Sequence, residues 1–215
     1  MKLELQPASE EDMQRLFTIT SLAFAKNEPF WDAMYPRHDT EEGRKSGSER
    51  FKKMMSRPEV HFIKAVDLDT GDIAGFGKWA VFDNYAPDDP PTIPEDAPYW
   101  ETEDERAYAE HLLKQFVACR NEAIKRTGGN MVNLDVLTID PAYQRKGVGD
   151  MLVRWGVEKA DGMGVEAVVE SSVPGRRLYE KHGFEYRKTV ELELPEKWKY
   201  KDPSRFAWME RSKKA

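Results

Sequence analysis

Residues 144–149 have the composition of an anion-binding loop. The segment reads Gln-Arg-Lys-Gly-Val-Gly and joins an apolar strand, expected at 134–139, to an amphipathic helix. Glycine lets the backbone approach a ligand closely, and the first N–H groups of a helix have no partner within the helix. Arg145 and Lys146 add positive charge. The spacing therefore predicts a site for a pyrophosphate.

Two commoner phosphate-binding loops do not match this segment. A dinucleotide-binding loop has the pattern G-x-G-x-x-G, and a Walker loop ends in Gly-Lys-Ser or Gly-Lys-Thr, whereas this loop contains only Gly147 and Gly149. Glycines before a helix can also be purely structural. The basic residues and the core-facing stripe that begins with Val148, Met151 and Leu152 favour the ligand-binding interpretation.

A second segment, VVESSVPGRRLYEKHGFEY from Val168 to Tyr186, predicts a strand end, a loop of small residues and a short helix. Together, Q-x-x-G-x-G and the downstream E-S-S…G-x-x-L-Y-E-K-x-G-F resemble the motifs of the GCN5-related N-acetyltransferase (GNAT) superfamily in order and spacing. The motifs lie between Leu134 and Phe184, and the resemblance covers most of the chain.

This resemblance implies an α/β fold of the mixed α+β type, in which a twisted sheet of about seven strands has helices on both faces. It also implies that acetyl-coenzyme A binds between two splayed parallel strands and transfers its acetyl group directly to an amine. By the same resemblance, the pantetheine arm pairs with the backbone of Leu137, Thr138 and Ile139, and Ser172 and Leu178–Tyr179 form the far wall beside the thioester. The implied pyrophosphate loop comprises Gln144, Arg145, Lys146, Gly147, Val148, Gly149 and Asp150.

Two carboxylates are candidates for the general base. An attacking amine is mostly protonated near neutral pH, so a carboxylate or a water held by one must take its proton. The resemblance implies this role for Glu170, and Asp135 is a charged residue inside an apolar strand. Strand alternation would place Asp135 on one face with Asn133 and Leu137, and burial there would raise its pKa. Alternatively, Asp135 pairs with a basic neighbour or lies at an exposed sheet position, and Glu170 only caps the next turn.

Tyr179 is the candidate general acid. The departing thiolate needs a proton, and a phenol can supply it without ionising beforehand. The resemblance implies this role, whereas the alternative is an aromatic packing residue on a short helix. Cys119 is the single cysteine and lies in a helical pattern, so we expect a core thiol without a chemical role.

Composition excludes several classes of protein. The 215 residues are 40% hydrophobic and 33% charged, with a net charge of -6 and a pI of about 5.4. A folded globular protein is expected, without the basic surface that nucleic-acid binding needs. The chain shows no signal-peptide core and no apolar run of membrane-spanning length, so we expect a cytoplasmic protein that does not contact membranes. The four histidines are far apart, and no metal site is expected.

The local patterns predict one domain over residues 1–215. Strands are expected near 3–5, 60–67, 73–82, 134–139, 165–170, 184–194 and 206–211, and helices near 13–24, 40–56, 102–127, 148–160 and 175–182. The hairpin turn at 68–72 and the capping box of Ser9 and Asp12 support the nearest of these elements.

Residues 83–129 form a Pro- and acid-rich insertion followed by an extra helix. From Asp83 to Glu105 there are nine acidic residues, five prolines and no basic residue, which predicts an exposed excursion. Its aromatic residues could wall the acceptor site or be solvated decoration, and the segment Phe24–Trp31 could border the same site. The aromatic set is Trp79, Phe82, Tyr85, Tyr99 and Trp100.

The sequence thus predicts an acetyl-coenzyme A-dependent N-acetyltransferase that acts on the primary amine of a small molecule, as a monomer or homodimer. Transfer is expected in a ternary complex, because the single cysteine lies outside the motifs and offers no covalent intermediate. One alternative is an acetyltransferase for protein lysines or N-termini. The other is an acyl-coenzyme A-binding module without catalysis.

Overall fold

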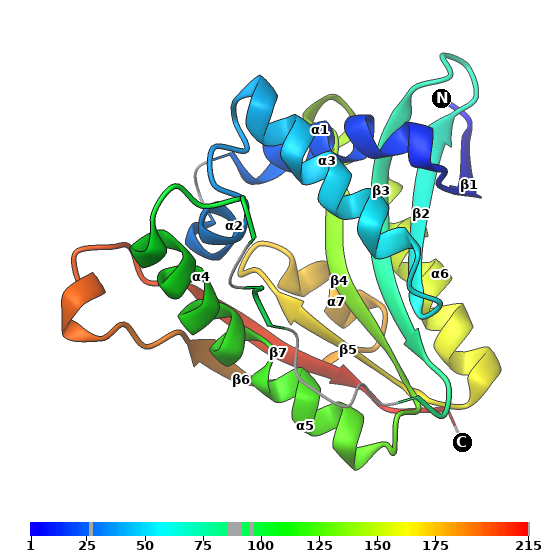
Figure 1. Ribbon diagram of the computed structural model, residues 1–215. Coiled ribbons are helices and arrows are strands. Elements are labelled where there is room, and N and C mark those ends of the chain that lie inside the picture. The colour runs from blue at the N-terminus through cyan, green and yellow to red at the C-terminus, as the bar shows by residue number, and fades with distance from the viewer. Residues whose placement is uncertain (26–27, 86–91, 95–96, 215) are drawn as a thin grey trace.

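A single mixed sheet organises the chain (Figure 1). The computed structural model describes residues 1–25, 28–85, 92–94 and 97–214. Within them, seven strands follow the order β1-β2-β3-β4-β5-β7-β6. The strands are β1 (Leu3–Pro7), β2 (Val60–Asp67), β3 (Ile73–Phe82), β4 (Met131–Ile139), β5 (Glu166–Ser171), β6 (Glu185–Glu191) and β7 (Arg205–Arg211). The predicted mixed sheet of about seven strands is confirmed.

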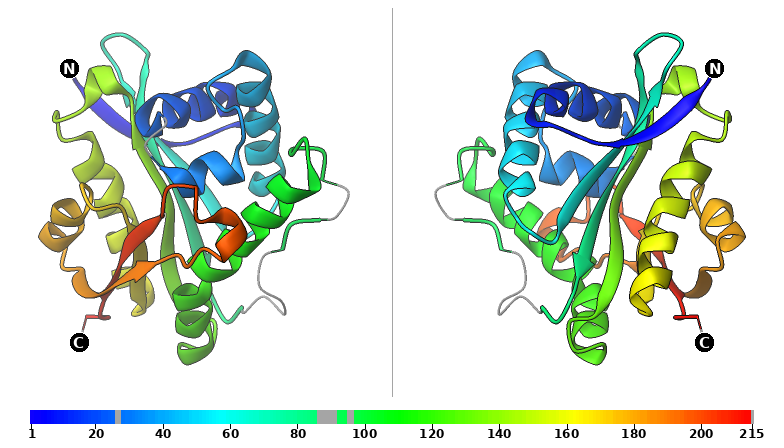
Figure 2. Two further views of the ribbon diagram at one scale, coloured as in Figure 1. Left: turned by 90° about the vertical axis from the view of Figure 1, so that its left-hand side faces the viewer. Right: turned by 90° about the vertical axis from the view of Figure 1, so that its right-hand side faces the viewer.

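Helices cover both faces of this sheet (Figure 2). Helices α1 to α5 lie on one face, and α6 and α7 lie on the other. The α-helices are α1 (Met13–Phe24), α2 (Pro29–Met34), α3 (Glu41–Met55), α4 (Glu103–Phe116), α5 (Ala118–Arg126), α6 (Val148–Met163) and α7 (Arg176–Lys181). Short 3-10 turns η1 (Glu10–Asp12), η2 (Pro141–Tyr143) and η3 (Glu196–Trp198) complete the described elements.

Strands β4 and β5 form a short parallel ladder and then separate. Their pairing runs from Met131 opposite Glu166 to Leu134 opposite Val169. Beyond that point β4 remains paired with β3, and β5 remains paired with β7. The two arrows diverge visibly in Figure 1. The sheet therefore leaves one edge of β4 without a strand partner over its last five residues, within the part of the chain that the structure describes.

A β-bulge at Asp135 changes the face on which the following residues lie. Lys78 pairs with Val136 and Trp79 pairs with Leu134, so Asp135 is the extra residue on β4. Val136 packs with α1 and α3 on one face, whereas Leu137 packs with the core under α6 on the other. The prediction that Leu137 shares a face with Asp135 is therefore wrong, because simple alternation holds only where a strand has no bulge.

Two helical predictions also need correction. Helix α2 was not predicted, and the single helix expected at 102–127 is two helices that meet at Val117. No glycine or proline marks this break, which coincides with packing of Phe116 against Phe30 and Phe206 at ring-centroid distances of 3.9 and 4.8 Å. Helix α5 is thereby a separate element that can turn its own side chains toward β4 and β5.

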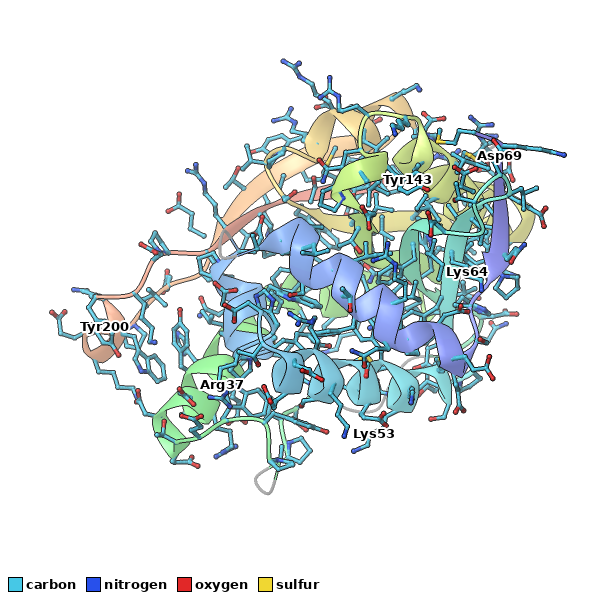
Figure 3. The ribbon with its side chains drawn as sticks, turned by 90° about the horizontal axis from the view of Figure 1, so that it is seen from above. Arg37, Lys53, Lys64, Asp69, Tyr143 and Tyr200 are labelled. Atoms are coloured by element: carbon cyan, nitrogen blue, oxygen red, sulfur yellow. The ribbon has the colours of Figure 1, made fainter. Side chains whose placement is uncertain are left out.

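The connection between β6 and β7 lies along α4. Trp198 packs against Tyr108 at 5.2 Å between ring centroids, and its indole N–H donates to the carboxylate of Asp104. Seen from above, Tyr200 on this connection lies far from Tyr143, which follows β4 (Figure 3). The connection thus lies away from the loop that follows β4. No helix among the described residues is long and apolar enough to cross a membrane.

Candidate active site

The loop between β4 and α6 is held in place from both sides. Asp140 accepts a hydrogen bond from the backbone amide of Ala142. It also forms an ion pair with Arg15 of α1, in which the nitrogen–oxygen distance is 2.6 Å. The hydroxyl of Tyr143 donates to Asp72 in the β2–β3 turn, and Figure 3 shows Tyr143 on that side of the molecule. The loop backbone is therefore anchored before the glycines begin.

Two residues of the loop have left-handed backbone conformations. Arg145 has a φ of 62° and Gly147 has a φ of 84°, and Gly147 is the N-cap of α6. A Cβ added to Gly147 would have no protein atom within 4 Å. The space above this helix N-terminus is therefore open, and the alternating backbone resembles the anion-binding concavities formed by successive amides.

The amide groups of this loop lack an acceptor in the described part of the chain. No described residue accepts a hydrogen bond from the backbone amides of residues 144–150. Three of these amides begin α6, where unpaired donors and the helix dipole favour an anion. The side chains of Gln144, Arg145 and Lys146 are exposed beside them, whereas the side chain of Val148 is buried. Val148 can therefore contribute only its backbone.

The carboxylate of Asp150 is bound by other side chains of the protein. Its carboxylate pairs with Lys181, with Arg154 at 2.8 Å and with His182 at 3.1 Å, so it joins the start of α6 to the end of α7. These partners, led by the hydrogen bond from Lys181, lower its pKa to about 2. In the free protein, Asp150 offers its amide to the loop and its side chain to the contact between the two helices.

Asp135 and Glu170 belong to one largely buried ion cluster. The guanidinium of Arg120 from α5 contacts Asp135 at 2.6 Å and binds both oxygens of Glu170, at 3.0 and 2.8 Å. Lys78 from β3 lies 3.0 Å from the other oxygen of Asp135, and the amide of Asn133 donates to Asp135 at 2.6 Å. The cluster therefore holds two cations and two carboxylates where β4 and β5 separate.

The two carboxylates differ in their electrostatic environment. Burial alone would raise the pKa of Asp135, but Arg120 and Lys78 together hold it below its ordinary value. Burial also acts on Glu170, whose side chain is only 1% exposed, and here it prevails over Arg120 and raises the pKa. The prediction of a raised pKa for Asp135 is therefore wrong, because it has two basic partners. The expected alternative, a basic neighbour, is what the structure contains.

Tyr179 and Ser172 both lie close to Gly175, the residue before α7. A Cβ added to Gly175 would lie 3.2 Å from the Ser172 hydroxyl and 3.2 Å from the ring of Tyr179. The ring packs edge-on against Phe184, and burial raises the pKa of the phenol. No hydrogen bond joins the Tyr179 hydroxyl to a described residue. Leu178 packs close to Gly149, which brings α7 against the first turn of α6.

The aromatic residues expected around the acceptor site have different locations. Trp79 is fully buried under α6 and Phe82 is also buried, so neither is part of an exposed wall. Trp100 donates to the carbonyl of Ala33 on α2, and Tyr85 is 47% exposed. Residues 86–91 and 95–96 of the excursion, and residues 26–27 of the segment 24–31, lie outside the described residues.

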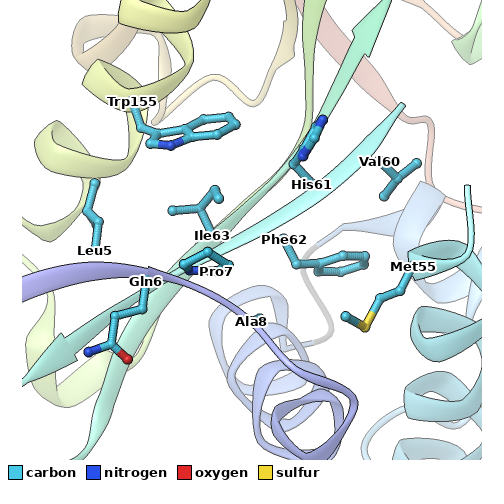
Figure 4. Close-up of a pocket in the computed structure, with 10 residues that line it drawn as sticks. All are labelled: Leu5, Gln6, Pro7, Ala8, Met55, Val60, His61, Phe62, Ile63 and Trp155. Carbon is cyan, nitrogen blue, oxygen red and sulfur yellow. The ribbon is translucent and has the colours of Figure 1, made fainter. Parts of the chain in front are cut away.

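A surface hollow of about 300 Å³ lies elsewhere, beside β1 and β2 (Figure 4). It is lined by Trp155, His61 and Met55 among others, and it contains none of the predicted site residues. Burial is the main reason why the pKa of His61 is lowered. Among the described residues, no group of three or more His, Cys, Asp or Glu side chains is placed to hold a metal ion. Cys119 is buried, as expected.

Sequence reasoning missed Arg120 and Lys78. Arg120 lies in a helix that reads as an ordinary amphipathic segment, and Lys78 interrupts the apolar strand β3. The charge of Lys78 in an apolar strand was a usable signal, since Asp135 interrupts the neighbouring strand in the same way. Arg120 carried no such signal, because its partners lie 15 and 50 residues away in the sequence.

Comparison with known proteins agrees with this geometry. A model of the acetyltransferase (GNAT) domain family matches residues 101–186, which include α4, α5, the loop and α7. A search of the curated proteins found no match.

Solved structures of acetyltransferases share the whole fold. A mosquito arylalkylamine N-acetyltransferase like 5b has a TM-score of 0.69 at 17% identity, with 98% of this chain and 99% of that chain covered. The phosphinothricin acetyltransferase of Sinorhizobium meliloti, in complex with AcCoA, has a TM-score of 0.60 at 15% identity, covering 99% and 89%. A Corynebacterium glutamicum structure described as histone acetyltransferase HPA2 and related acetyltransferase has a TM-score of 0.59 at 17% identity, covering 100% and 98%. Residues 101–186 thus match the acetyltransferase (GNAT) domain family, and the whole chain has the fold of these solved acetyltransferases.

Proposed function

We propose that the protein transfers the acetyl group of acetyl-coenzyme A to the primary amine of a small molecule, by direct attack in a ternary complex. The observation that carries the proposal is the run of amides at 144–150, which have no acceptor among the described residues, beside two strands that separate at a pair of carboxylates. The amides suit a pyrophosphate, and the unpartnered edge of β4 at Leu137, Thr138 and Ile139 suits an amide-containing arm. Ser172 follows the last residue of β5, and Tyr179 lies on α7.

Glu170 is the better candidate for the general base. Both oxygens of Asp135 are already bound. Arg120 and the side-chain amide of Asn133 contact one oxygen, and Lys78 contacts the other. Among the described side chains, only Arg120 donates hydrogen bonds to Glu170, so lone pairs on the Glu170 oxygens remain available. Its raised pKa also makes it the stronger proton acceptor of the two. In this proposal Asp135 stays ionised and helps to hold Arg120.

The chemistry balances with one acid and one base. Glu170, directly or through a water, takes a proton from the acceptor ammonium, and the free amine attacks the thioester carbon to form a C–N bond. When the C–S bond breaks, the thiolate takes the proton of the Tyr179 phenol. The new amide nitrogen loses its second proton to restore the phenol, and Glu170 releases its proton to water. Burial keeps Tyr179 protonated until the thiolate forms.

Two observations support a small amine as acceptor. The proteins of similar fold include an arylalkylamine N-acetyltransferase and a phosphinothricin acetyltransferase. The chain is acidic, with a net charge of -6, which favours approach of cationic molecules. A protein acceptor is the second candidate, because one neighbour is described as a histone acetyltransferase. The test must therefore contain both classes.

The experiment combines calorimetry with a thiol-release assay. Acetyl-coenzyme A is titrated into the protein, and thiol release is then measured over arylalkylamines, polyamines, amino sugars and histone peptides. We expect binding of the coenzyme and turnover with at least one small amine. Turnover on peptides alone would favour the protein-acceptor alternative. Tight binding without turnover on any amine would identify a coenzyme-binding module, and absence of binding would overturn the proposal.

A further inference from the structure

Arg120 occupies a specific place relative to the ends of the β4–β5 ladder. Leu134 and Val169 are the last paired residues, and the next residue on each strand is Asp135 and Glu170. One guanidinium contacts both side chains, with a nitrogen to each oxygen of Glu170 and a third nitrogen to Asp135. All three nitrogens of Arg120 are therefore used at the point where the strands separate.

The side chains in this cluster are shielded from solvent. The exposed fractions are 15% for Arg120, 13% for Asp135 and 1% for Glu170. Burying charges is costly, and apolar residues of similar size often stabilise a fold as well or better. A contribution to the stability of the fold is therefore a weak explanation for the presence of an ion cluster where the two strands separate. The position of the cluster where β4 and β5 separate suggests a role in the reaction.

We infer that Arg120 is a positioning residue for acetyl transfer, which holds Glu170 in place and keeps it ionised for proton abstraction. The inference rests on the proposed function, with Glu170 as the base. Arg120 need not touch the substrate to act in this way. Its forked geometry fixes both oxygens of Glu170, which a lysine with a single nitrogen cannot do while also reaching Asp135.

The charges around Glu170 determine the expected pH dependence. Arg120 from α5 and Asp135 from β4 act on Glu170 directly, and Glu170 in turn contributes to the raised pKa of Cys119 on α5. Lys78 and Arg57 act on Asp135, and Lys188 from β6 acts on Cys119. Arg120 is the single cation named here that contacts Glu170, so its removal takes away the charge that opposes the effect of burial.

The same helix offers a matched control. Arg126 also bridges two carboxylates, Glu166 on β5 at 2.6 Å and Glu210 on β7 at 3.0 Å. Its side chain is 48% exposed, and it lies at the other end of the β4–β5 ladder. A purely structural role for arginine in joining α5 to the sheet would affect Arg120 and Arg126 variants in the same manner.

The experiment compares Arg120→Met, Arg120→Lys, Arg126→Met, Glu170→Gln and the double variant Arg120→Met with Glu170→Gln. For each we measure kcat/KM against pH with one amine, coenzyme affinity by calorimetry and folding by circular dichroism. We expect Arg120→Met to lower kcat/KM by about 100-fold. The acid limb of the profile, where kcat/KM falls as the pH is lowered, should move to higher pH by about one to three pH units, because Glu170 loses its cationic partner. Coenzyme affinity should remain within a few-fold of the parent.

The other variants decide between the interpretations. Arg120→Lys keeps the charge and should move the acid limb less than Arg120→Met, while its rate at the pH optimum falls. If Arg120 acts through Glu170, the double variant should be no slower than Glu170→Gln alone. Arg126→Met should leave the profile unchanged. An unmoved acid limb in folded Arg120→Lys and Arg120→Met, or additive losses in the double variant, would overturn the inference. An inactive parent protein would instead contradict the proposed function.

Discussion

Asp135 and Glu170 lie on adjacent strands, one residue beyond the last pair of the β4–β5 ladder, and a single guanidinium joins them. The relationship does not need the bulge, because Asp135 shares a face of β4 with Asn133 by ordinary strand alternation and the bulge changes only the face of the residues that follow. It gives the two carboxylates different partners and different pKa directions. Several measurable consequences depend on this arrangement and on the loop beside it.

Replacing Glu170 by glutamine should remove the proton acceptor and preserve the fold. We expect kcat to fall by about 100- to 10,000-fold, the usual contribution of a general base. Calorimetry should find coenzyme affinity unchanged, since the coenzyme loop lies elsewhere. Glu166→Gln is the control on the same strand, because Glu166 pairs only with the surface residue Arg126 among the described side chains. Equal losses in both variants would contradict a catalytic role for Glu170.

Replacing Tyr179 by phenylalanine should slow turnover by about 100-fold and leave coenzyme binding intact. The hydroxyl has no hydrogen bond to a described residue, so the ring can keep its packing against Phe184. Because burial raises the pKa of the phenol, no basic limb from Tyr179 is expected below pH 10 in the parent profile. Tyr186→Phe, at an exposed tyrosine on β6, serves as control. Unchanged turnover in Tyr179→Phe would remove the phenol from the mechanism.

Gly147→Val should abolish coenzyme binding. A side chain there would occupy the open space above the start of α6 where the phosphates are expected. Gly164 at the other end of α6 is the matched control, with a φ of 66° against 84° and equally open surroundings. Both valine variants should lose stability by about 1 to 3 kcal/mol from backbone strain. Retention of parent affinity in Gly147→Val, measured by calorimetry, would exclude the loop as a pyrophosphate site.

Asp150 should stabilise the contact between α6 and α7 in a pH-dependent way. Its pKa is about 2 in the folded protein, against 3.8 for an aspartate free of such partners, so the stabilisation is complete above about pH 4. It is lost as the pH falls from 3.8 toward 2, because the unfolded chain then binds the proton first. Urea unfolding should show Asp150→Asn to be less stable than the parent at pH 7, with the difference shrinking toward pH 2. Glu158→Gln, on the same helix and exposed, should show no such trend.

Much of the fold was predictable because its determinants are local. The predicted limits of β2 and β3 are confirmed, since alternating apolar runs and a turn with Gly71 define that hairpin within 23 residues. The start of α4 was predictable from the cap Thr102, whose side chain accepts from the amide of Glu105. The unpaired amides at 144–150 likewise follow from glycines and a helix start that are adjacent in sequence.

The sequence by itself therefore predicted the mixed sheet and the glycine-containing loop before α6, and it carried the resemblance to the GNAT superfamily. The tertiary structure decided which charged side chains contact one another. The bulge at Asp135 arises from pairing with β3, and Arg120 reaches Glu170 only because α5 separates from α4 at Val117. These contacts join residues up to 50 positions apart in the sequence. The periodicity of apolar residues cannot predict contacts between residues so far apart. Packing of three distant elements, rather than any local propensity, placed both candidate bases on one guanidinium.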